Sequence, residues 1–218
     1  MSSFIGHSLA GLTTYAIGHQ LQLNQWNRSI FQSSFLAPLK KNFHNWLWLI
    51  WLIAIASVPD IDYLSPIFKV KYLDRSIRIT HSFVGVLLVP GISILVMWLL
   101  GDRGQNFKTK SLQVVIVGLS HLLLDTLTGS YPKPLLYPFS LETFKLPFGI
   151  LPSAGRIDLN NYLLYRNLVI ELGVLVPLSI SSILSVSDVR SRDKYKSIIW
   201  GGLLVSGCFM IKAASLTR

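Results

Sequence analysis

The stretch GLSHLLLDT, residues 118–126, places two ionisable side chains inside an otherwise apolar run. His121 and Asp125 are four residues apart, so in a helix they lie on the same face. An ionisable group at mid-membrane costs at least about 2.5 kcal/mol, so such groups are usually paired, metal-bound or functional. The stretch therefore predicts a helix that turns His121 and Asp125 towards other parts of the protein.

The composition extends this prediction to the whole chain. Only 14% of the 218 residues are charged and the mean hydropathy is +0.50, whereas a soluble domain carries about 25% charge. The charges gather between long apolar runs, as they do when lipid surrounds the helices. We therefore expect an all-α, polytopic membrane bundle of about six helices, forming a single domain over residues 1–218. The expected helices are 4–18, 46–58, 83–100, 111–128, 167–186 and 198–214.

A long loop, residues 129–166, separates the fourth and fifth expected helices and contains five prolines. It is too apolar and aromatic for a disordered segment, so we expect it to fold as a proline-rich cap. Residues 1–18 lack the positively charged start of a signal peptide and are expected to form a retained first helix. The first two helices are shorter than the roughly 20 residues of a full crossing, so they could be tilted, longer than the apolar pattern indicates, or half-spanning.

Three of the five histidines, and the aspartates in or just after the second and fourth expected helices, fall at one membrane face if consecutive helices alternate in direction. His19 and His44 fall at the opposite face, which separates them from the candidate ligands. Glu171 joins the candidates because it is expected one turn into the fifth helix. The candidate metal ligands are His7, Asp60, Asp62, His81, His121, Asp125 and Glu171.

A histidine or aspartate at any one of these positions has an ordinary structural explanation, such as a turn after Pro59 or orientation of His121. Together, three imidazoles and three aspartates at one level form a ligand set suited to zinc, with manganese or iron as alternatives. The only cysteine, Cys208, lies in an apolar run and offers neither a disulfide nor a thiolate site. We therefore expect a divalent metal bound by histidine and carboxylate, with the number of ions left open.

Hydroxyl groups next to the candidate ligands can fix the orientation of those ligands. They are Thr80, Ser82, Ser120, Thr126 and Thr128. A serine nucleophile activated by histidine is the competing enzymatic interpretation, since Ser82 follows His81 and Ser120 precedes His121. Adjacent helical positions point about 100° apart, which disfavours direct serine–histidine activation.

The formal net charge of +10 does not come with a basic-aromatic nucleic-acid motif, so nucleic acid is not expected as a partner. The lysines and arginines lie in loops that would meet anionic headgroups, which makes membrane lipids the expected partners. Ten lysines and arginines fall at each face of the expected bundle. Those opposite the candidate ligands lie in shorter loops, so the positive-inside rule predicts a site that faces away from the cytoplasm.

Several motifs resemble the bacterial YdjM-like family of inner-membrane, metal-dependent hydrolases, also called LexA-binding membrane-associated hydrolases. The resemblance is spread through most of the chain and implies a multi-pass protein of the inner (plasma) membrane. The motifs are Gly6-His7, Pro59-Asp60-Ile61-Asp62, Thr80-His81-Ser82, residues 118–128, Pro134-Leu135-Leu136-Tyr137-Pro138 and Lys145-Leu146-Pro147.

The chain departs from the family where Ser76-Ile77 replaces a His-Arg pair that usually precedes Thr-His-Ser. This departure removes an imidazole that could act as a ligand or a proton carrier, while Arg75 and Arg78 lie alongside and could supply positive charge to an anionic substrate. More distantly, the order His, Asp, His, His-x-x-x-Asp is similar to the ligand order of zinc-dependent phospholipases C, which implies a phosphoester substrate.

The function predicted from residues and resemblance is metal-dependent hydrolysis of a small-molecule or lipid-linked ester, with a phosphoester favoured. The predicted catalytic residues are Asp62, His121 and Asp125; Asp62 is the candidate general base, and Asp60 or Asp62 could bridge two ions. A cation or proton transporter is one alternative, and it requires polar residues that continue across the bilayer. A scaffold with a structural metal is another, and it requires a closed coordination sphere.

Overall fold

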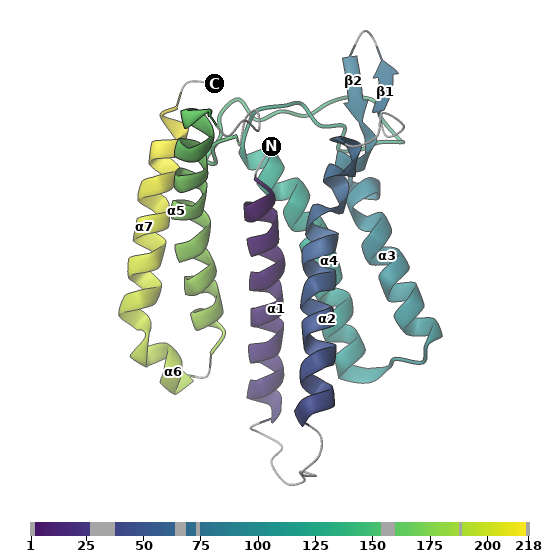
Figure 1. The fold of residues 1–218 in the computed structure, drawn as a ribbon, viewed down its shortest axis with the longest axis vertical. Helices are drawn as coiled ribbons and strands as arrows, with labels where there is room; N and C mark the ends of the chain where they lie inside the picture. The colour runs from purple at the N-terminus through teal and green to yellow at the C-terminus, as the bar shows by residue number, and fades with distance from the viewer. Residues whose placement is uncertain are drawn as a thin grey trace.

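The computed structural model describes residues 3–26, 38–63, 69–72, 75–153, 160–187 and 189–216. Within these residues the chain is an all-α bundle in which six long helices run side by side and alternate in direction (Figure 1). The helices are α1 (Phe4–Trp26), α2 (Pro38–Ser57), α3 (Phe83–Leu99), α4 (Gly104–Leu127), α5 (Tyr162–Ser185) and α7 (Lys196–Ala214), with a short α6 (Val189–Lys194) before α7.

Short elements connect α2 to α3 at the end of the bundle where α1 begins (Figure 1). They are the 3-10 helix η1 (Val58–Tyr63), the antiparallel strands β1 (Lys69–Tyr72) and β2 (Arg75–Arg78), and the 3-10 helix η3 (Ile79–His81). Pro59 lacks the N–H that would continue α2, which accounts for the change to 3-10 geometry. The change matters for the site because η1 carries Asp60 and η3 carries His81.

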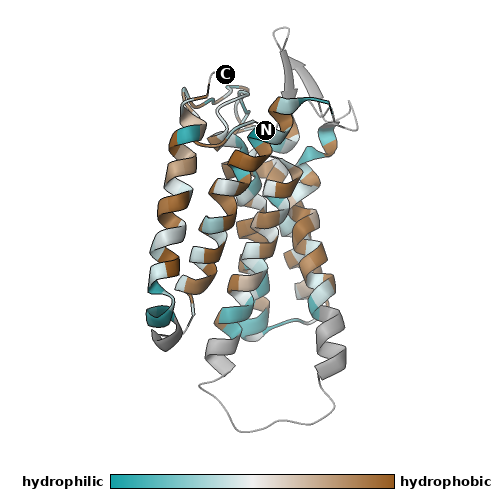
Figure 2. Ribbon diagram, turned by 60° about the vertical axis from the view of Figure 1, so that its left-hand side comes forward, coloured by the Kyte–Doolittle hydropathy of each residue, from teal (hydrophilic) through white to brown (hydrophobic). Residues whose placement is uncertain are grey.

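The outer surface of the bundle is apolar, as expected of helices in lipid. Leu88, Ile92, Leu204 and Ile211 are all more than half exposed, and the hydropathy colouring shows apolar residues along the helices (Figure 2). Four segments are long and apolar enough to cross a membrane, and α3 is apolar but shorter. The four segments are Asn45–Asp62, Gly104–Leu127, Tyr162–Ser185 and Lys196–Ala214.

Close packing of α3 against α4 depends on a glycine. A Cβ atom at Gly118 would lie 2.6 Å from the backbone oxygen of Val86 and 2.9 Å from Cγ of Pro90. Any larger residue at this position would therefore push the two helices apart. Because His81 immediately precedes α3 and His121 lies one turn beyond Gly118 on α4, this close approach also brings the two histidines together.

The predicted bundle of long helices is confirmed, but several boundaries were wrong. α4 begins at Gly104 instead of 111, and α5 begins at Tyr162 instead of 167 because the Asn161 side chain caps it by accepting a bond from the Leu163 N–H. Glu171 therefore lies in the third turn of α5, not one turn into it. The hairpin of β1 and β2 was not predicted, because its two four-residue strands are too short to give a periodic pattern.

Gly118→Ala is expected to destabilise the protein by about 1–3 kcal/mol, because it overpacks the contact between α3 and α4. Gly201→Ala is the matched control, since a Cβ atom there meets nothing within 4 Å. The free energy of unfolding of the purified protein, measured by detergent denaturation, checks both variants. Equal stabilities for the two variants would contradict the close approach at Gly118.

Candidate metal centre

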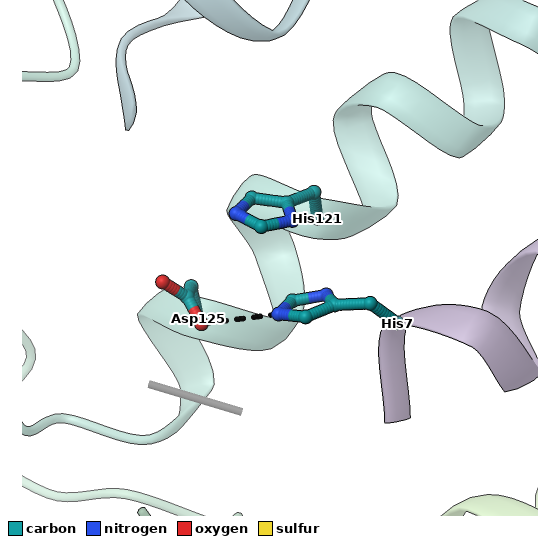
Figure 3. Close-up of side chains that lie close together, drawn as sticks. All are labelled: His7, His121 and Asp125. Atoms are coloured by element: carbon teal, nitrogen blue, oxygen red, sulfur yellow. Dashed lines mark ion pairs between the residues drawn. The ribbon is translucent and has the colours of Figure 1, made fainter. Parts of the chain in front are cut away.

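Five of the predicted ligands converge at one end of the bundle, from four different elements. His7 comes from the first turns of α1, Asp60 from η1, His81 from η3, and His121 and Asp125 from the last turns of α4. In the close-up, His7 and Asp125 face each other and the ring of His121 lies over that of His7 (Figure 3). We call these five residues the His/Asp cluster.

Donor atoms of the cluster lie 3.3–3.9 Å apart. Asp125 approaches two histidines, with His7 Nε2 at 3.5 Å from Oδ1 and His81 Nε2 at 3.3 Å from Oδ2. Asp60 approaches all three histidines through their Nε2 atoms, at 3.6–3.9 Å. The Nε2 atoms of His81 and His121 are 3.4 Å apart.

These spacings fit a bound metal ion. Ligands held at about 2.0–2.1 Å around one tetrahedral ion lie about 3.4 Å from one another. Two groups of three donors have all their ligand atoms within 4.8 Å of one another, one made by His7, His121 and Asp125 and the other by Asp60, His81 and His121. Because each group has three donors, either one leaves a position of a tetrahedral ion open, and because the groups share His121 the five donors can hold one ion or two.

Buried polar atoms without hydrogen-bond partners support the same conclusion. Both ring nitrogens of His7 and Oδ1 of Asp60 are buried and have no hydrogen bond within the described part of the chain. A buried polar atom that lacks its hydrogen bond costs about 1–3 kcal/mol. A cation between these atoms would remove that cost, so the donors present fit a metal ion.

Hydrogen bonds at Nδ1 prepare two of the histidines to use Nε2 as the ligand atom. His121 Nδ1 lies 2.7 Å from the carbonyl oxygen of Ala56. A carbonyl only accepts, so Nδ1 carries the hydrogen and Nε2 keeps its lone pair towards the cluster. His81 Nδ1 lies 3.1 Å from the Thr80 hydroxyl, which can donate or accept, and 3.5 Å from the Asp62 carboxylate, which favours a hydrogen on Nδ1; its Nε2 faces the cluster.

The charge state of His81 shows how strongly the carboxylates favour a cation. Burial alone lowers the pKa of His81, but the carboxylates of Asp125, Asp60 and Asp62 outweigh that effect and raise it to about 10. Without a bound metal, a proton on this imidazole supplies the positive charge that the carboxylates require. A divalent ion can supply the same charge, because it competes for the same nitrogen.

Asp62 lies behind His81 and is fully buried. Its Oδ2 atom is 3.5 Å from His81 Nδ1 and 3.7 Å from Arg78 Nε. This is the place of the carboxylate that orients a metal-bound histidine in many metal sites. Arg78, which the sequence suggested as a possible positive charge near the site, therefore contacts Asp62, which lies outside the five-residue cluster.

Glu171 is not brought into the cluster. Its two carboxylate oxygens accept hydrogen bonds from the Ser3 N–H at 2.9 and 3.2 Å, at the start of α1. This carboxylate binds an N–H that α1 leaves without an intrahelical partner, and its negative charge complements the helix dipole. Glu171 thus holds the helix that carries His7.

The hydroxyl groups expected around the ligands have mixed roles. Thr80 contacts His81, and Thr128 donates to the backbone oxygen of Asp125. Ser120 and Thr126 instead bond to carbonyls of their own helix. Ser82 donates to the Ile79 oxygen and caps α3 by accepting from the Gly85 N–H, an arrangement that does not fit a nucleophile.

Lys133 is a buried site residue that the sequence did not indicate. Its Nζ atom donates to the backbone oxygens of Asp125 at 2.8 Å and of Tyr131 at 3.3 Å, and the side chain is only 4% exposed. Burial lowers the pKa of Lys133, while the negative charge of Asp125 acts in the opposite direction. A lone lysine between Pro132 and Pro134 in an apolar loop was the signal that could have identified it.

The fold and the cluster define a polytopic helical membrane protein with a buried His/Asp group near one membrane face, where five donors can hold a metal ion. A family model described as YdjM inner membrane protein matches residues 1–190, and the chain belongs to that family. The match includes every predicted site residue. No curated protein and no solved structure matches the chain, so the similarity to zinc-dependent phospholipases C stays a prediction.

His121→Ala and Asp125→Ala are expected to reduce bound metal to the background level, because each removes a donor near the centre of the cluster. His19→Ala, an exposed histidine at the other end of α1, and Glu171→Gln are expected to keep the wild-type metal content. Elemental analysis of the purified proteins in detergent checks this. Full metal content in both alanine variants would contradict the assignment.

Asp62→Asn is expected to weaken metal binding by roughly 10–100-fold while keeping the wild-type stoichiometry at saturating metal, as loss of a carboxylate that orients a ligand does. A chelator competition titration measures the affinity. If the asparagine variant binds no metal even at saturation, Asp62 is itself a ligand, as the sequence suggested.

Proposed function

We propose that this protein is a membrane-bound, metal-dependent hydrolase that acts on an anionic phosphoester presented at the membrane face. The observation that carries the proposal is a cluster of five metal donors with a single accessible edge. Membership of the YdjM family supports the membrane location. The hydrolytic reaction is our inference from the cluster.

The accessible edge is Asp60. Its side chain is 21% exposed, whereas those of His7, His81, His121 and Asp125 are at most 2% exposed. Structural metal sites are closed by protein ligands, while catalytic sites keep an open position for water or substrate. Exposure limited to one donor therefore favours a catalytic site over a structural one.

The charges around the cluster favour an anionic substrate. Asp60, Asp62 and Asp125 bring three negative charges, while Arg78, Lys133 and one divalent ion would bring four positive charges. The loaded centre would then be net positive, and a second ion would increase the excess. A phosphoester is an anion that such a centre attracts, and a membrane-face position favours one attached to a lipid.

His7, Asp60, His81, His121 and Asp125 would hold the ion, and zinc suits a set of neutral imidazoles and carboxylates, with manganese or iron as alternatives. A divalent ion held there would act as a Lewis acid on water and on the ester. Asp60 is the carboxylate placed to accept a proton at the open edge. We assign Asp62 to the orientation of His81, because it is buried behind that ring and contacts Arg78.

Transport of a cation or proton is the second candidate, and an apolar layer argues against it. Gln113, which lies eight positions before His121 on α4, forms a polar group towards the other membrane face with Trp48 and the Thr14 carbonyl. Between it and His121 lies a fully buried apolar group. This layer consists of Leu52, Ile55, Ala56, Val114 and Val117, and it interrupts the polar path that a transporter needs.

The activity test uses purified wild type loaded with zinc or manganese, assayed on a chromogenic phosphodiester and on phospholipid in mixed micelles. Asp125→Ala and chelator treatment are each expected to reduce turnover by at least about a hundredfold, while His19→Ala keeps it. Metal-loaded protein without turnover on either substrate, together with proton or cation flux in proteoliposomes, would replace this proposal by transport.

A further inference from the structure

A polar cavity lies at the same end of the bundle as the cluster, between the loop after α4 and the start of α5. Its volume is about 320 Å³. One wall follows α4 directly, and the other belongs to α5 and the end of the chain after α7. Ser130, Tyr131, Lys145, Arg166, Asn167 and Leu216 are among the residues that line it, and no described lining residue is acidic.

Arg166 is held in place at this cavity. Its Nε and Nη2 atoms donate to the Asn167 Oδ1 atom at 3.2 and 3.1 Å, and the Asn167 amide in turn donates to the Ser153 carbonyl at 2.8 Å. The remaining guanidinium donors have no partner among the described residues. A fixed guanidinium with unused donors loses little side-chain entropy when it binds an anion.

The two cations of the cavity, Lys145 and Arg166, have no carboxylate partner within the described ranges. Two positive charges that share a cavity repel each other, and an anion between them removes the repulsion. Arginine matches the geometry of a phosphate, and lysine adds a point charge. Since ligand cavities range from about 300 to 1,000 Å³, this one holds a headgroup but not the acyl chains of a lipid.

We propose that this cavity binds a phosphate group, either as the headgroup of an anionic lipid or as free phosphate. Its position at the end of the membrane-spanning helices places it at the depth of lipid headgroups, where basic side chains attract anionic lipids. The cavity uses none of the metal donors, so the proposal does not depend on the proposed hydrolase activity.

The test compares full-length wild type with the double variant Lys145→Gln/Arg166→Gln in detergent. Native mass spectrometry counts retained phosphatidylglycerol or diacylglycerol of the same acyl chains, and inorganic phosphate is titrated as a competitor. Wild type is expected to prefer phosphatidylglycerol, and the double variant is expected to lose at least about tenfold in affinity for it. Lys108→Gln/Arg192→Gln, which removes two exposed positive charges at the opposite face, is the matched control and should behave as wild type.

An unchanged metal content and circular dichroism spectrum confirm that the double variant is folded, so lost lipid binding reports on the cavity. Displacement of the lipid by inorganic phosphate would support a site for phosphate in both forms, and lipid binding that resists phosphate would support a headgroup site. Phosphate binding without lipid retention would support a free-phosphate site. Equal retention of the two lipids without phosphate binding, or full binding by the double variant, would overturn the proposal.

Discussion

Mutual contact between imidazoles and carboxylates is what allows this apolar bundle to contain a charged centre. A single buried carboxylate would cost far more than the bundle gains from burying a leucine. With three histidines around Asp60 and Asp125, each negative oxygen lies within 4 Å of a potential positive charge. These residues can therefore be buried in the folded state only if the four elements that carry them bring them to the same depth in the bundle.

The backbone is shaped to meet that requirement. Pro59 ends the α-helical part of α2 just before Asp60, and Gly118 lets α3 approach α4 closely enough for His81 to reach His121. The Ala56 carbonyl then fixes the ring of His121. Donor geometry and helix packing are thus one constraint, because a shift of α4 would change both the distance from His121 to His81 and the hydrogen bond from His121 to the Ala56 carbonyl of α2.

The sequence was sufficient for the parts of the site that follow from helix periodicity and alternation. His121 and Asp125 share a face because they are four residues apart, and His7, Asp60 and His81 reach them because the helices alternate. Lys133 was not predicted: its position between two prolines in an apolar loop was a signal, but its contact with Asp125 depends on how an irregular loop folds back over α4. Glu171 was expected near the start of the fifth helix because Arg166 interrupts the apolar pattern in the second turn of α5, which moved the expected start of that helix to 167.

The contact between Glu171 and the Ser3 N–H has a consequence for the order in which the protein is made. A ribosome delivers all five donors of the cluster before residue 171, because the last of them is Asp125. The first turn of α1, which carries His7, gains its carboxylate partner only when α5 has been inserted beside it. All five donors of the cluster are therefore synthesised before Glu171, the residue of α5 that holds the start of α1 in place.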